Sequence, residues 1–225
     1  MFSLESWRAL LVDWRLFAQG LGQTVLASVL ALALALVLGV IVGVLGVVPV
    51  RPLRWLNRIY VEFFQNTPLL TQVFFYYYGL PRLGLRLPVL AVGVMGLGIY
   101  TGAYIAEIIR AGILSVHRGQ LEAAFSQGFR YQEAMRYIVL PQAFRVIMPP
   151  LTNQFVNLIK NSSILSFIAG YDLMYHADVW SSYSLLYGVA YVTIAALYLC
   201  LTLPTATLAR RLERRMQATW GGSVS

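Results

Sequence analysis

The sequence predicts an all-α integral membrane protein with five transmembrane helices. Hydrophobic residues make up 59% of the chain and charged residues only 12%, whereas a typical soluble domain carries about 25% charge. Long uncharged stretches recur, and arginines gather between some of them. The net charge of +8 therefore favours loops held against anionic lipid over contact with nucleic acid, and a water-soluble enzyme is disfavoured.

The N-terminal segment, residues 1–19, has the pattern of an interfacial helix. Its apolar residues recur at helical spacing, at Trp7, Leu10, Leu11, Trp14 and Phe17, and tryptophan favours the depth of the lipid headgroups. We expect a helix in the outer interface of the membrane, with a frayed polar terminus as the alternative. A signal peptide fits poorly, because the apolar run that follows is far longer than the usual run of about 7–15 residues.

Four uncharged stretches are long enough to cross the hydrocarbon core, which takes about 20 residues in a helix. Their apolar parts are residues 25–48, 69–80, 87–106 and 185–203. The third stretch is rich in glycine, which permits close approach between helices.

A further span is expected at residues 146–159, although Pro149 and Pro150 interrupt it and its length alone would also suit a re-entrant segment. Basic residues are enriched in cytoplasmic loops. Five spans with the N-terminus outside place twelve basic residues on three inside segments: Arg51, Arg54 and Arg58; Arg110, Arg118, Arg130, Arg136 and Arg145; and Arg210, Arg211, Arg214 and Arg215. Four spans would put one Arg-rich segment outside, so five spans and a cytoplasmic C-terminus are favoured.

The sequence has no phosphate-binding glycine loop and no His/Cys cluster with metal-ligand spacing. We therefore expect no metal site and no cofactor on this chain. Cys200 lies in an apolar run and is interpreted as a packing residue.

The long inside loop contains a short amphipathic helix. Leu121, Ala124, Phe125 and Gly128 fall at i, i+3, i+4 and i+7 from Leu121, which forms a small apolar stripe. The stripe suits docking into a groove of another protein, with Phe125 as the anchor. An interfacial loop helix without a partner is the alternative.

The stretch from Glu122 to Pro141 resembles the E-A-A-x3-G-x9-I-x-L-P coupling-loop signature of permease subunits of ATP-binding cassette importers, at all seven defining positions. Residues 107–110, 119–120 and 141–143, with Asn66-Thr67-Pro68-Leu69-Leu70, resemble the polar amino-acid uptake branch. The likeness covers residues 20–209. It divides the chain into an N-terminal interfacial segment (1–19), a type 1 permease domain (20–209) and a basic cytoplasmic tail (210–225).

The resemblance implies the type I importer permease fold in the plasma membrane of a prokaryote. It implies two cytoplasmic ATPase subunits that bind ATP and Mg, a second permease subunit in a homo- or heterodimer, an extracytoplasmic solute-binding protein and a polar amino-acid substrate. Coupling to the ATPases is thereby assigned to Glu122, Ala123, Ala124, Phe125 and Gly128. Gln65 and the run Lys160-Asn161-Ser162-Ser163-Ile164 depart from the branch pattern, so the identity of the amino acid stays open.

Polar residues inside spans are functional candidates, because they are costly to bury in lipid. Asn153, Asn157, Lys160 and Asn161 share one face of the fourth span and suit the carboxylate and ammonium groups of an amino acid. The alternative is that they bond to neighbouring helices or line the dimer seam. Thr71 and Gln72 are weaker candidates.

Glu107 and Arg110 stand at i, i+3, where an ion pair is available within one helix. Glu107 lies about 28 Å along a helix from Pro88, near the cytoplasmic end, so we expect a structural pair or an inner gate. The external segment 161–183 is rich in aromatic residues. It suits docking of the binding protein, or simply the membrane interface.

Two rival functions are an ion-driven transporter or channel and a membrane-embedded enzyme. The first class usually shows internal repeats, and we find none. An enzyme would need paired carboxylates or a nucleophile with its base. Glu62 and Glu107 are expected on opposite sides of a long loop, which disfavours such a pair.

Overall fold

The structure is a computed structural model that describes the backbone of residues 2–220 and the side chains of residues 2–211. Its α-helices are α1 (Leu4–Val12), α2 (Trp14–Leu45), α3 (Arg51–Asn66), α4 (Leu69–Phe74), α5 (Val89–Leu114), α6 (Arg118–Ser126), α7 (Tyr131–Ala134), α8 (Leu140–Asn161), α9 (Leu173–Ser184) and α10 (Tyr187–Trp220). The π-helices are η1 (Phe75–Gly79) and η3 (Met135–Val139), and the 3-10 helices are η2 (Leu80–Leu83) and η4 (Ser162–Ile168). Residues 2–220 contain no strand, which confirms the all-α prediction.

Three helices are long and apolar enough to cross a membrane: α2, α5 and residues 187–211 of α10. They coincide with the first, third and last spans expected from the sequence. The fourth expected span lies in α8, which runs unbroken for 22 residues through Pro149 and Pro150, about 33 Å at the helical rise. The helix begins at Leu140, so it is longer than the apolar run 146–159 suggests.

The second expected span is not one helix centred on residues 69–80. The chain forms α3, breaks at Thr67 and Pro68, and continues as α4, η1 and η2. Proline disfavours the helical conformation in the residue before it, and Thr67 is extended, with φ −105° and ψ 131°. The buried Gln72 amide donates to the carbonyls of Phe64 and Thr67, both at 3.0 Å, and so satisfies groups that the break leaves without helical partners.

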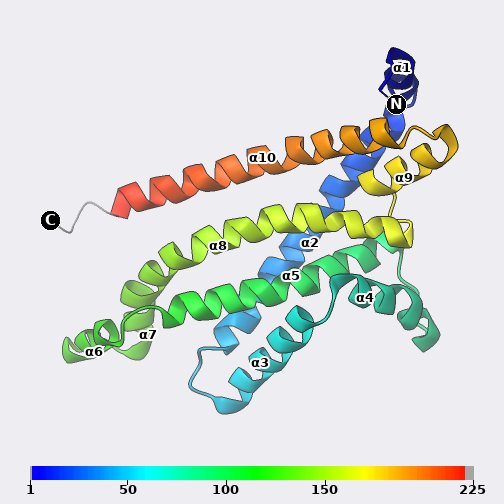
Figure 1. The fold of residues 1–225 in the computed structure, drawn as a ribbon. Helices are drawn as coiled ribbons and strands as arrows, with labels where there is room; N and C mark the ends of the chain where they lie inside the picture. Colours follow the sequence, from blue (N-terminus) through cyan, green and yellow to red (C-terminus); the bar gives the residue numbers. More distant parts are fainter. Residues whose placement is uncertain (1, 221–225) are drawn as a thin grey trace.

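The core of the bundle is the contact between α2 and α5, and α10, α8 and α5 cross in front of α2 (Figure 1). Glycines set this contact. A Cβ on Gly39 would overlap Ile105, and one on Gly43 would lie 2.7 Å from the carbonyl oxygen of Ala106. A Cβ on Gly98 of α5 would lie 2.7 Å from Leu34, so the close approach predicted for the glycine-rich span is confirmed.

The N-terminal segment is not one helix over residues 1–19. It breaks at Asp13, and α2 then runs through residue 19. Leu10 and Phe17 are buried, and Phe17 packs edge-to-face on Trp180 with ring centroids 5.7 Å apart. The indole of Trp180 donates to Asp13 Oδ2 at 2.8 Å. One part of the expected interfacial stripe therefore faces the protein, while Leu11, at 67% exposure, does not.

Candidate functional site

Helix α6 is a defined element with a cap at each end. His117 Nδ1 accepts from the backbone N–H of Gly119 at 3.1 Å at its start. At its end, Phe129 N donates to the carbonyl of Ala124 at 3.1 Å and Gly128 N donates to that of Phe125 at 3.0 Å, which is the Schellman pattern. Gly128 has φ +84°, a conformation that strongly favours glycine. The glycine of the signature therefore ends the helix and turns the chain.

The two faces of α6 differ. Ala124 is 1% exposed, and Leu121 packs against the apolar cluster that includes Met135 and Val139. The structure thus divides the predicted stripe, because Leu121 and Ala124 hold the helix to its own subunit. The exposed coupling candidates are Glu122, Ala123, Phe125 and Gly128.

The chain leaving α6 leads directly into α8. Glu133 Oε2 accepts from the backbone N–H of Arg130 at 2.7 Å at the start of α7, and η3 follows without interruption into α8. Helix α8 packs against α5, where a Cβ on Gly112 would overlap Ile147. The exposed face of α6 is therefore joined through packed side chains to the helices of the bundle.

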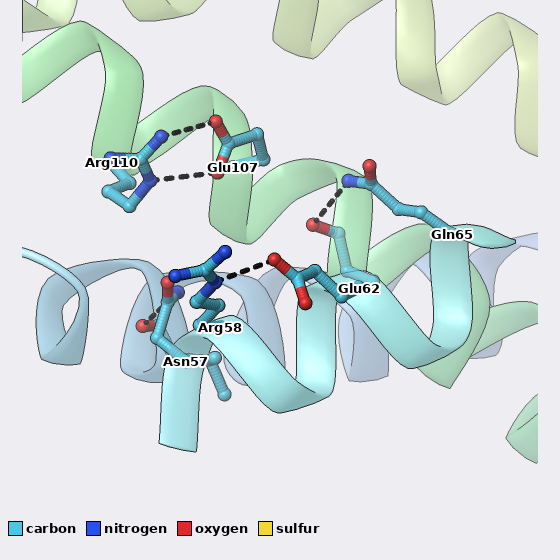
Figure 2. A network of polar contacts seen from close by, with 8 residues as sticks. Asn57, Arg58, Glu62, Gln65, Glu107 and Arg110 are labelled. Carbon is cyan, nitrogen blue, oxygen red and sulfur yellow. Dashed lines mark hydrogen bonds and ion pairs between the residues drawn. The ribbon is translucent and has the colours of Figure 1, made fainter. Parts of the chain in front are cut away.

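A charged cavity of about 510 Å³ lies between α3 and α5. Arg110 donates to Glu107 through two bonds, Nε to Oε2 at 2.8 Å and Nη2 to Oε1 at 2.6 Å, which confirms the predicted ion pair. On α3, Arg58 Nε donates to Glu62 Oε1 at 2.6 Å. Figure 2 shows both pairs, one on each helix. The remaining lining residues are Gly46, Arg54, Asn57, Val61 and Gln65.

Helix α3 is held in this position by side chains that donate to backbone carbonyls. Asn57 Nδ2 donates to the oxygen of Val42 at 2.9 Å and Tyr60 OH to that of Ile99 at 2.7 Å. Gln65 Nε2 donates to the oxygen of Ala103 at 3.2 Å (Figure 2). Gln65, one of the departures from the branch pattern, thus lines the same cavity as Glu107.

The sequence prediction that separated Glu62 from Glu107 is wrong, because both line the same cavity. The spacing of the charged residues of α3 indicated the α3 side of this cavity. Arg54, Arg58 and Glu62 stand at i, i+4 and i+8, which places them on one helical face. The partner face on α5 was not evident from local spacing.

The candidate substrate residues of α8 lie on one continuous helix. Asn153 and Lys160 are exposed, and Asn157 and Asn161 are half-buried. Lys160 lines a cavity of about 330 Å³ whose walls come from the segment 160–163, α9 and α10, where Ser163, Tyr191 and Tyr198 also lie. The weaker candidates Thr71 and Gln72 line a cavity of about 340 Å³ at the break between α3 and α4.

Residues 35–218 match the family described as "Binding-protein-dependent transport system inner membrane component". The chain belongs to this family. It is 49% identical over 211 residues to the probable glutamine ABC transporter permease protein GlnM of Bacillus subtilis (strain 168), covering 94% of this chain and 98% of that protein. It is 38% identical to the glutamate/aspartate import permease protein GltJ of Escherichia coli (strain K12), over 68% of this chain and 70% of that protein.

The fold of this permease is similar to that of an amino acid ABC transporter crystallised with histidines, with a TM-score of 0.86, 37% identity, and coverage of 92% of this chain and 97% of that chain. An inward-facing structure of the MetNI methionine ABC transporter gives a TM-score of 0.73 at 18% identity, over 91% and 97% of the two chains. The second likeness concerns the fold alone.

The resemblance inferred from the coupling loop is thus confirmed, and the chain is an amino-acid ABC importer permease. Subunits of this kind are transport components without a catalytic site of their own. Membership implies ATPase partners, a binding protein and a second permease as a class. The rival assignments to an ion-driven transporter and a membrane enzyme are set aside.

Proposed function

We propose that this permease imports a polar or charged amino acid by alternating access, driven by two cytoplasmic ATPase subunits that bind the exposed face of α6. The observation that carries the proposal is the form of α6. It is a short helix with defined caps, anchored by Leu121 and Ala124, and it presents Glu122, Ala123 and Phe125 outward.

The proposed orientation has five spans, with the N-terminus outside and the tail in the cytoplasm of a prokaryotic cell. What supports it is the arrangement of the basic segments. The start of α3, the α6–α7 loop and the C-terminal end of α10 lie toward one end of the bundle, and α1 and α9 lie toward the other (Figure 1). Since cytoplasmic segments are enriched in arginine, the α6 end is the side where ATP is available.

The proposed mechanism is a rigid-body switch between two packings. ATP and Mg bind the partner subunits, and closure of the ATPase pair moves α6. Leu121 and Ala124 transmit the movement to η3 and α8, and the contact of Ile147 with Gly112 transmits it to α5. This subunit performs no covalent step.

Substrate recognition is proposed for Asn153, Asn157, Lys160 and Asn161. They share one helix, none of them is fully buried, and Lys160 lines the cavity beside α10. The Glu107–Arg110 pair is proposed as an inner gate, since it lines the cavity between α3 and α5. A polar or charged substrate is supported by the names of the similar permeases for glutamine and for glutamate/aspartate.

The remaining partners are a second permease subunit, identical or related, an extracytoplasmic binding protein and the lipid bilayer. For the binding protein we propose the external segment 161–183, where Tyr171 and Tyr183 are 57% and 59% exposed. Tyr171 precedes α9 and Tyr183 lies in its last turn, and α9 is at the end of the bundle away from α6 (Figure 1).

The experiment that tests the proposal is Glu122→Lys combined with Ala123→Asp. Both side chains are exposed, so the subunit is expected to fold normally while ATPase docking and uptake are lost. Ala124→Asp is less informative, because it places a charge at a buried position. Co-purification of the ATPase subunits together with normal uptake in proteoliposomes would show that α6 is not the coupling element.

A further inference from the structure

Asp172 is a fully buried carboxyl in the segment between α8 and α10. It is 0% exposed and forms the N-cap of α9, where its Oδ2 accepts from the backbone N–H of Met174 at 3.1 Å. Its Oδ1 has no hydrogen-bond partner in the part of the chain that the structure describes. A buried carboxylate oxygen without a donor is costly, so this group has a reason to bind a proton.

The first turn of α9 is seated directly on α2 around this carboxyl. Leu173 N donates to Thr24 Oγ1 at 3.0 Å, and a Cβ on Gly20 would lie 2.9 Å from Leu173 Cα and 3.0 Å from the carbonyl oxygen of Asp172. Gly20 and Thr24 are one helical turn apart. The docking of α9 therefore brings Asp172 into close contact with α2, out of reach of water.

Among the side chains that the structure describes, those that act electrostatically on Asp172 carry no positive charge. Tyr198 of α10 lies close enough to interact electrostatically with it, and the Tyr198 hydroxyl is near the buried hydroxyl groups of Ser162 and Thr24. On α9, Asp178 adds a like charge, and burial lowers the pKa of His176, which favours its neutral form. Lys160 lines the cavity beside Tyr198.

Burial raises the pKa of Asp172 to about 7, against the opposing effect of the backbone N–H groups of Met174, Tyr175 and Asp172 itself. The ordinary value for this carboxyl is 3.8. Protonation near neutral pH thus agrees with the contacts, which offer the second oxygen no donor.

We propose that Asp172 is a proton-binding site, and that the bound proton holds the first turn of α9 on α2. Loss of the proton leaves a buried charge and weakens this docking. On the proposed orientation α9 is external, so the permease senses the pH outside the cell at the segment assigned to the binding protein.

The backbone before Asp172 has a strained conformation, which favours release of the first turn of α9 from α2. Ala169 and Tyr171 have φ +54° and +53°, a region that side-chain-bearing residues rarely adopt. Such conformations persist only where the surrounding packing imposes them. When the docking of α9 weakens, this segment is therefore expected to relax.

The direction of the pH effect follows from proton linkage. The docked state holds the proton up to about pH 7, whereas a water-exposed carboxyl releases it near 3.8. The docking of α9 is therefore fully stable below about pH 3.8. It loses stability as the pH rises from there toward about 7, and above that pH the loss levels off. Between about pH 6 and pH 8 the equilibrium constant for opening that exposes Asp172 rises about tenfold.

The test is hydrogen–deuterium exchange of the assembled importer in lipid nanodiscs, with rates corrected for intrinsic chemistry. Backbone amides of residues 172–178 are expected to lose about tenfold in protection between about pH 6 and pH 8. Asp172→Asn keeps an N-cap acceptor but does not ionise, so its protection is expected not to change over this range. Asp178→Asn is the matched control and keeps the response. A pH-independent wild type, or an unchanged response in Asp172→Asn, overturns the proposal.

A second measurement covers the case in which Asp172→Asn does not assemble. Infrared spectra of the wild-type complex are expected to show a neutral carboxylic acid band that disappears as the pH rises through about 7. Absence of the band overturns the proposal, and so does protection that follows Na⁺ concentration, which would identify a metal cation instead. Both measurements are independent of ATPase docking at α6, so they fail separately from the proposed function.

Discussion

Arg110 and Glu107 form a two-bond ion pair on α5, with Nε–Oε2 and Nη2–Oε1 distances of 2.8 and 2.6 Å. The side chains are 34% and 37% exposed, so the pair contributes at most about 1 kcal/mol to folding. Its place in the cavity between α3 and α5 makes a role in gating testable separately from stability.

Glu107→Gln and Arg110→Gln are each expected to lower amino-acid uptake severalfold while changing the unfolding free energy by less than about 1 kcal/mol. The double exchange Glu107→Arg with Arg110→Glu restores an ion pair and is expected to recover part of the uptake. Uptake assays in proteoliposomes and thermal unfolding of the complex separate the two effects. If the double exchange loses as much uptake as the single variants, one of the two charges acts alone.

Gly128→Ala is expected to weaken coupling, because an alanine at φ +84° costs about 1–2 kcal/mol of backbone strain at the end of α6. Gly84 is the matched control, since it has φ +85° and, like Gly128, no atom of the described residues within 4 Å of an added Cβ. Gly84→Ala carries the same strain far from α6. Binding-protein-stimulated ATP hydrolysis is expected to fall in Gly128→Ala only, and an equal fall in both variants would remove the special role of α6.

Lys160→Ala is expected to raise the KM for uptake about tenfold or more, because a hydrogen bond to a charged group contributes about 1.5–3 kcal/mol. Asn157→Ala is expected to have a smaller effect in the same direction. Asn66→Ala is the control, since its exposed side chain donates to the carbonyl of Glu62 in its own helix. If both α8 variants keep the wild-type KM and substrate-stimulated ATP hydrolysis, the substrate assignment to α8 fails.

Gly39→Ala is expected to destabilise the permease by about 1–3 kcal/mol, because its Cβ would overlap the side chain of Ile105. Gly22, on the same helix, has no atom of the part of the chain that the structure describes within 4 Å of an added Cβ, so Gly22→Ala is expected to be tolerated. The measurement is the midpoint of thermal unfolding of the purified complex, compared between Gly39→Ala and Gly22→Ala. Similar midpoints for the two variants would contradict the account of α2–α5 packing.

Features that depend on local spacing could be predicted from the sequence. The Glu107–Arg110 pair follows from i, i+3 spacing, and the glycines of residues 87–106 anticipated the close contact with α2. Features created by packing between distant segments could not. The burial of Asp172 depends on Thr24, which bonds its neighbour Leu173 from 149 residues away.

Helix α6, for which we propose the coupling role, shows both situations. Its existence and its terminal glycine follow from the signature, whereas the division of its faces does not, because periodicity alone does not say which side meets the subunit's own core. Ala124 is buried in the structure, where α6 contacts α7 and η3 as the chain returns toward the bundle. The break at Pro68 was visible in the sequence, but its effect on the second span becomes clear only where Gln72 bonds across it.

The central claim, that the exposed face of α6 binds an ATPase subunit, is tested most directly by photo-crosslinking from position 125. Phe125 is 45% exposed, and Tyr187, at the start of α10, is a matched aromatic control at 47%. With a photoreactive phenylalanine at each position of the assembled importer, an adduct with the ATPase subunit is expected from 125 and not from 187. An active complex that gives no ATPase adduct from position 125 would contradict the account.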